Sequence, residues 1–213
     1  MASISKPKRN KWRSTWTKQL YLWHWVSSAI CLVAMVLFAF TGITLNHAGS
    51  IPAQLTKVEL RETLPAALMS SIEWDGESAS MDAPLPKELR RYLERNIDMR
   101  LHHRVAEWSE YEIYLALPQP GSDAWLTIDR ETGEWEFAKT KRGWIAYLND
   151  LHKGRNTGPA WSVFIDVFSV ACVVFCLTGL LLLAMHAKRR PSTWPVVAAG
   201  VVIPAVLLLF FVH

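Results

Sequence analysis

The sequence is poor in cysteine and contains no glycine-rich nucleotide fingerprint. Its three cysteines, Cys31, Cys172 and Cys176, all lie in long apolar stretches, and the polar middle of the chain has none. A disulfide-stabilised scaffold is therefore excluded. Cys172 and Cys176 are one helical turn apart, which is compatible with a metal pair, but packing as small apolar residues is the stronger interpretation. No Gly-x-Gly-x-x-Gly follows a predicted strand, so flavin or NAD would have to act through another molecule.

The chain does contain three long apolar stretches, within a composition that is 51% hydrophobic. A run of about 18 or more apolar residues is long enough to cross a bilayer as a helix. The three stretches are Trp25–Leu45, Ala160–Met185 and Trp194–Val212. Pro195 and Pro204 predict a kink in the third, which is tolerated where neighbouring groups satisfy the freed carbonyl. The sequence thus predicts a membrane protein with three transmembrane helices.

Basic residues gather beside the ends of these stretches. Before the first stretch come Lys6, Lys8, Arg9, Lys11, Arg13 and Lys18, and directly after the second come Lys188, Arg189 and Arg190. Positive charge beside a span marks the cytoplasmic side. The N-terminus is therefore predicted to be cytoplasmic and residues 49–158 to be periplasmic. The basic residues beside the spans account for the net charge of +4, so the charge does not predict a nucleic-acid partner. The first stretch is too long for a cleaved signal peptide and is interpreted as an uncleaved anchor.

The segment between the first two spans predicts a small α+β domain. Leu85–Ile97 has apolar residues at helical spacing, and residues 111–117, 124–129 and 135–137 have strand patterns with a turn at 129–134. The domain is either a scaffold or a module that binds a ligand or partner, since fold alone does not decide. His102 and His103 invite a metal interpretation, but without a third ligand a surface role is favoured.

Four histidines lie at the ends of the first two spans. His24 and His47 bracket the first span, whereas His152 precedes the second and His186 closes it. In antiparallel spans, His24 and His186 share one membrane face and His47 and His152 the other. One histidine at a helix end is usually only an interfacial residue. Four in this correspondence predict two pairs of axial ligands for haem iron, one pair per leaflet.

Three charged residues near the second span have open roles. Lys153 and Arg155, beside His152, suit the propionates of a haem, although a solvated basic loop is the simpler alternative. Asp166 is costly inside an apolar stretch. It would orient a histidine, conduct protons, pair with Lys153 or Arg155, or stabilise the start of a helix.

Several motifs resemble one family. The segments Leu22–Trp25, Phe40–His47, Leu148–Arg155 and Leu177–Leu181 are similar to the PepSY-associated transmembrane helix family. Asn149–Arg155 (NDLHKGR) is the most specific of them, and the turn at 129–134 resembles that of a PepSY domain. Larger relatives include bacterial inner-membrane ferric-siderophore reductases, which bind b-type haems through histidines on their spans. The resemblance implies electron transfer across a membrane towards a periplasmic acceptor.

The expected fold is a membrane α-helical protein with a small PepSY-like α+β periplasmic domain between the first and second spans. The expected segments are 1–19 (cytoplasmic), 20–48 (first span), 49–143 (periplasmic domain), 144–158 (interfacial helix and loop), 159–187 (second span), 188–193 (cytoplasmic loop) and 194–213 (third span).

The expected function is electron transfer in the bacterial inner membrane by one or two haem b groups. The donor would be quinone or a flavoprotein, and the acceptor a ferric chelate, a siderophore or a periplasmic redox protein. The alternatives are a non-enzymatic anchored module that binds or regulates a periplasmic partner, and a small transporter that uses Asp166.

Overall fold

The computed structural model describes residues 11–52, 54–73 and 80–212. The basic residues Lys6, Lys8 and Arg9 and the C-terminal His213 lie outside these ranges. The chain forms two compact units. One comprises the described residues of Met1–Leu37 and Val163–His213, and the other comprises those of Phe38–Ser162. Each unit contains two of the four histidines predicted to bind haem.

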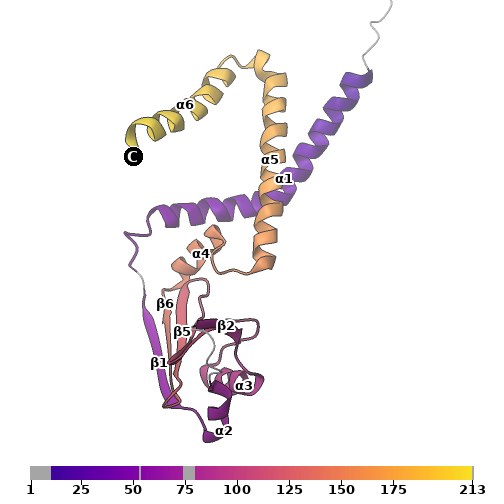
Figure 1. The fold of residues 1–213 in the computed structure, drawn as a ribbon. Helices are drawn as coiled ribbons and strands as arrows, with labels where there is room; N and C mark the ends of the chain where they lie inside the picture. The colour runs from indigo at the N-terminus through magenta and orange to yellow at the C-terminus, as the bar shows by residue number, and fades with distance from the viewer. Residues whose placement is uncertain (1–10, 53, 74–79, 213) are drawn as a thin grey trace, which may run out of the picture. The chain divides into compact units, whose positions relative to one another are not determined.

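The described residues form the helices and strands drawn in Figure 1. The helices are α1 (Lys11–Asn46), α2 (Ala66–Met69), α3 (Lys87–Ile97), α4 (Trp144–Lys153), α5 (Pro159–His186) and α6 (Thr193–Phe211), with 3₁₀ turns at Ser70–Ile72 and Ala187–Arg189. The strands are β1 (Thr56–Thr63), β2 (Ser80–Pro84), β3 (Val105–Ser109), β4 (Glu112–Ala116), β5 (Ser122–Asp129) and β6 (Glu134–Lys141).

Three helices in the described ranges are long and apolar enough to cross a membrane. They cover Ser14–Asn46, Pro159–Arg189 and Thr193–Phe211, as the apolar stretches predicted. The most apolar window of each of the last two has none of its residues buried inside the protein. A helix that is apolar on all sides and lacks protein cover is typical of one surrounded by lipid. The prediction of a membrane protein with three apolar helices is therefore confirmed.

The segment between α1 and α4 folds as a six-stranded antiparallel sheet in the order β1-β6-β5-β4-β3-β2. Strands β4, β5 and β6 are the three that the sequence predicts, and α3 is the predicted helix. Figure 1 shows α2 and α3 beside the sheet. Buried residues alternate along β4 and β5, so one face of the sheet packs against Leu89, Leu93 and Ile97 of α3.

Strands β1, β2 and β3 are absent from the sequence prediction. β1 is an edge strand whose residues are exposed except for the half-buried Leu60. A strand with one inward residue has almost no alternation for a pattern to detect. β2 and β3 are short strands of five residues each.

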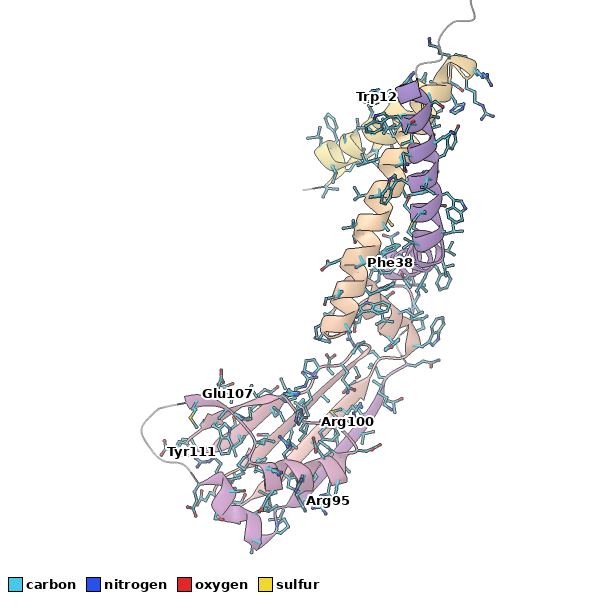
Figure 2. All side chains as sticks on the ribbon, turned by 90° about the vertical axis from the view of Figure 1, so that its right-hand side faces the viewer. Trp12, Phe38, Arg95, Arg100, Glu107 and Tyr111 are labelled. Carbon is cyan, nitrogen blue, oxygen red and sulfur yellow. The ribbon has the colours of Figure 1, made fainter. Side chains whose placement is uncertain are left out.

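The opposite face of the sheet has no described helix packed on it and is rich in acids. Figure 2 shows Arg95 on the helical side of the sheet and Glu107 on the other side. By strand register and exposure, this face carries Asp82, Glu59, Glu107, Glu112, Asp123, Asp129, Glu134 and Glu136, together with Lys57 and Arg61. On this face Arg61 pairs with Glu136 of the neighbouring strand at 2.9 Å, and Lys57 pairs with Glu59 of its own strand at 3.5 Å.

Helix α4 is the predicted helix at 144–151, and it carries His152 near its end. It stops at Gly154, whose φ of 66° is left-handed and suits glycine. Gly158 has a φ of 81° and immediately precedes α5. Gly154 and Gly158 therefore mark a break between α4, which carries His152, and α5.

Candidate functional site

His24 lies in a cluster formed by α1 and α5, two helices that cross each other in Figure 1. We call His24, Phe175, Thr178 and Gly179 the His24 cluster. The His24 ring stacks on Phe175 with centroids 4.8 Å apart and planes at 14°. His24 Nδ1 is 3.0 Å from Thr178 Oγ1. A Cβ on Gly179 would lie 3.2 Å from His24 Cε1, so the absence of a side chain there lets the ring pack closely.

His152 lies in a second cluster of the same composition, formed by α4 and the last residues of α1. We call His152, Phe38, Thr41 and Gly42 the His152 cluster. His152 Nδ1 is 2.7 Å from Thr41 Oγ1, and its ring centroid is 5.1 Å from that of Phe38. A Cβ on Gly42 would lie 3.6 Å from His152 Cε1. Both clusters therefore place the same three residue types around one imidazole.

The hydrogen bonds in both clusters determine which imidazole nitrogen carries the proton. Thr178 Oγ1 is 2.7 Å from the carbonyl oxygen of Val174. Thr41 Oγ1 is likewise 3.1 Å from the carbonyl oxygen of Phe38. A threonine hydroxyl has one hydrogen and a carbonyl can only accept, so each threonine donates to its own helix. Its oxygen must then accept from histidine Nδ1–H, which leaves Nε2 with a lone pair.

His47 and His186 reach the same tautomer by a different route. His47 Nδ1 is 3.0 Å from the carbonyl oxygen of Ile43, and His186 Nδ1 is 2.8 Å from that of Leu182. A carbonyl requires a donor, so both rings carry the proton on Nδ1. His186 Nε2 is 3.4 Å from the Tyr21 hydroxyl, a long contact. In neutral form, all four histidines thus present a basic Nε2, the state that a metal ligand needs.

His24 and His186 line one hollow of about 990 Å³ in the α1 and α5 unit. This volume is at the upper end of the range of small-molecule and cofactor sites. Arg189 and Arg190 line it as well, and so do Gly179 and Tyr21. Two imidazoles and two guanidinium groups around a mainly apolar hollow suit a planar, anionic, metal-containing ligand.

The donor set fits haem better than an isolated metal ion. In the ranges that the structure describes, no three histidine, cysteine, aspartate or glutamate residues gather as ion ligands. Haem iron needs only two protein ligands, because the porphyrin nitrogens supply the others. His24 and His186 line the same hollow, so the structure brings one predicted ligand pair together there.

The two cations predicted for haem propionates differ in their surroundings. Lys153 is exposed at the end of α4. Arg155 Nη2 is 2.7 Å from Asp150 Oδ1. Asp150 is buried and also binds Arg142 Nη2 at 2.9 Å and the Gly121 N–H at 2.8 Å. Asp150 therefore links α4 to Gly121 and Arg142 beside the sheet, and Arg155 pairs with its other carboxylate oxygen, contacts that the sequence did not reveal.

A second polar contact anchors α4 beside His152. Thr44 Oγ1 donates to Asn149 Oδ1 at 2.8 Å, and Asn149 is buried. Asn149, Asp150 and His152 all belong to the NDLHKGR segment, and each of them makes a different contact from α4. Asn149 contacts α1, Asp150 contacts the sheet and, two residues later, His152 contacts Thr41.

The remaining candidates are not drawn into either cluster. Asp166 is exposed, and α5 has no acid in its first turn, so its interpretation as a helix-start acid is wrong. His102 and His103 lie in an exposed turn with ring centroids 3.7 Å apart. Cys31 is fully buried and Cys172 half-buried, whereas Cys176 is exposed and lines the hollow of His24 and His186.

Sequence reasoning missed Phe38, Phe175, Arg189 and Arg190 as site residues. In the sequence, Thr41-Gly42 and Thr178-Gly179 each precede the histidine that closes their own span. In the structure each pair instead contacts a histidine of another helix. The signal was present as Phe-x-x-Thr-Gly, which occurs at 38–42 and again at 175–179.

A comparison with curated proteins and another with solved structures each gave no match. A comparison with protein-family models gave one that covers residues 15–213, nearly the whole chain including both clusters. That model describes PepSY_TM-like proteins, and the chain belongs to this PepSY-associated transmembrane family.

Proposed function

We propose that this protein is a b-type haem protein of the bacterial inner membrane that transfers electrons across the bilayer to a periplasmic acceptor. His24 and His186 would ligate one haem iron, and His47 and His152 a second. When bound, haem supplies a one-electron Fe(III)/Fe(II) couple. The observation that carries this proposal is the shared hollow of His24 and His186, with Nε2 as the unprotonated nitrogen of both rings.

The charges of the same hollow support the proposal. Haem carries two propionates, and burying an anion is favourable only where cations or donors meet it. Arg189 and Arg190 supply two guanidinium groups beside His186. At the other site, Lys153 and Arg155 would do the same for the second haem, with Arg155 shared between a propionate and Asp150.

Orientation follows from the basic residues beside the spans. Lys188, Arg189 and Arg190 follow α5 directly, and positive charge marks the cytoplasmic side. On this basis the His24 cluster faces the cytoplasm and residues 49–158 are periplasmic. Electrons would then enter near His24 and leave near His152, towards a ferric chelate, a siderophore or a redox protein.

The test is a reduced-minus-oxidised absorption spectrum of the purified full chain, with haem measured per chain. We expect sharp b-type bands and about two haems per chain. One haem would contradict one of the two ligand pairs, and His24→Ala and His47→Ala would identify which. A colourless protein from haem-replete cells would overturn the proposal.

One observation favours the anchored binding module as the second candidate. The uncovered face of the sheet carries eight acidic and two basic residues, together with the exposed Tyr114. Such a face would attract a cationic periplasmic protein. This candidate predicts a colourless chain whose function survives loss of the four histidines.

A further inference from the structure

A second hollow lies between the N-terminal half of α1 and α5. It has a volume of about 460 Å³ and is lined mainly by apolar groups. Trp12, Trp16 and Trp23 contribute three indole rings, and Leu181 lies on the α5 side. Gln19 adds an amide, which can donate and accept hydrogen bonds. The site thus combines flat aromatic walls with a polar group.

This hollow adjoins the His24 cluster through one residue. Thr178 lines the hollow, and its Oγ1 accepts the hydrogen bond from His24 Nδ1 at 3.0 Å. A molecule bound there would lie one side chain away from His24. The hollow is made by two of the apolar helices, so a ligand would reach it most readily from the lipid phase.

We propose that this hollow, formed by Trp12, Trp16, Gln19, Trp23, Thr178 and Leu181, binds a lipid-soluble hydroquinone. Its ring would stack on the indoles, and the Gln19 amide would hydrogen-bond a ring oxygen. The inference rests on the proposed function for its electron acceptor. The chain has no dinucleotide fingerprint of its own, so an external donor is required.

The reaction balances with the haem irons as oxidant. A hydroquinone loses the hydrogens of both O–H groups and becomes a quinone, releasing two electrons and two protons. Ferric haem, when bound beside His24, would accept the electrons one at a time, at two haems or at one haem in two turns. The protons pass to water at the membrane surface beside the tryptophans.

The binding test does not depend on haem. The full chain in lipid nanodiscs is irradiated with an azido-quinone that carries a short isoprenoid tail. We expect label on the peptides that contain residues 12–23 and 174–181, displaced by unlabelled quinone. Leu181→Trp fills the hollow and should reduce this labelling roughly tenfold. Leu177→Trp is the matched control, since Leu177 is exposed one turn earlier on α5 and lines neither hollow described here.

Two results would overturn the inference. One is labelling that Leu181→Trp does not reduce. The other is displacement by an isoprenoid alcohol without a ring as effectively as by quinone, which would assign the hollow to an apolar lipid tail. Either can be obtained with a colourless protein, so failure here is separate from failure of the haem proposal.

The second test follows haem reduction after anaerobic mixing with a short-chain hydroquinone. Leu181→Trp should slow this reduction roughly tenfold relative to the wild type and to Leu177→Trp. Dithionite, which needs no binding site, should reduce all three at the same rate. Equal hydroquinone rates in a haem-containing wild type and Leu181→Trp would contradict the proposal.

Discussion

The two histidine clusters have the same residues but different supports. In the His24 cluster both partners come from apolar helices, and the imidazole lies nearly parallel to Phe175. In the His152 cluster the histidine comes from α4, whose Asp150 and Asn149 anchor it, and the ring is tilted by 42° from Phe38. One local motif can therefore be held either by packing between apolar helices or by a polar network. The difference predicts which changes should damage one cluster and spare the other.

The largest effect should come from removing each histidine. His24→Ala and His152→Ala should each abolish one haem and leave the other, because each change removes one of the two axial ligands of a single haem. Haem content per chain and the reduced spectrum measure this. His102→Ala, in an exposed turn, is the control and should keep both haems. If the alanine variant of His24 or of His152 keeps both haems, that histidine is not a haem ligand.

Asp150→Ala should damage only the His152 cluster. The change leaves Arg142 and Arg155 without their buried partner, which typically costs about 3–5 kcal/mol. We expect lower stability of the sheet unit in denaturant and loss of the haem at His152, with the haem at His24 retained. Asp123→Ala is the control, because its contact with Arg142 is 3.4 Å long and exposed. Equal loss of both haems would mean that the two clusters are not independently supported.

Thr178→Val and Thr41→Val should weaken haem binding at their own clusters. Valine keeps the shape but cannot accept from Nδ1–H, and loss of such a supporting contact typically lowers affinity by about 10–100-fold. Haem titration of the haem-free protein would measure this. Serine at either position should restore binding, since it retains the hydroxyl. Valine variants with wild-type affinity would show that the threonines only fill space.

Substitution of Gly179 and of Gly42 by alanine should affect the two clusters differently, because the glycine lies closer to the histidine ring in the His24 cluster. At Gly179 the new Cβ would lie 3.2 Å from His24 Cε1, so the ring must shift, at a cost of about 1 kcal/mol or more. At Gly42 the distance is 3.6 Å, which is ordinary contact, and alanine gains about 1 kcal/mol of helix propensity. Gly179 lies inside α5 and gains the same helix propensity, so we expect Gly179→Ala to alter the haem spectrum and to be less thermally stable than Gly42→Ala, which should keep the wild-type spectrum. The reverse order would contradict the packing described here.

The smallest effect concerns the turn between β5 and β6. The Asp129 carboxylate accepts hydrogen bonds from the Thr132 N–H and hydroxyl and from the Glu131 N–H, which lowers its pKa. A lowered pKa adds stability above the unfolded value of about 3.9, and this stability is lost as pH falls through the folded value.

Asp129→Asn should therefore reduce the stability of the sheet unit at neutral pH by less than about 1 kcal/mol, because the group is exposed. The difference from the wild type should disappear in acid, and the haem at His24 should be unaffected. Denaturant unfolding at several pH values checks this, and a difference that grows in acid would contradict the assigned cause.

Much of the architecture could be predicted from local patterns. Long apolar runs, the turn at 129–134 and the glycine break before α5 all depend on residues close together in sequence. The edge strand β1 could not, because it pairs with β6, some 70 residues later by register, and buries almost nothing itself. Pairing between distant segments leaves little trace in the sequence of either.

The candidate site divides in the same way. Composition and spacing alone determined that four histidines stand at the ends of apolar helices, since hydrophobic runs and their flanks need no tertiary information. Only the tertiary structure decided that Thr178 faces His24, that Thr41 faces His152 and that Arg155 pairs with Asp150. These contacts join residues of different helices, and a hydrogen bond requires a distance near 3 Å that sequence separation does not encode.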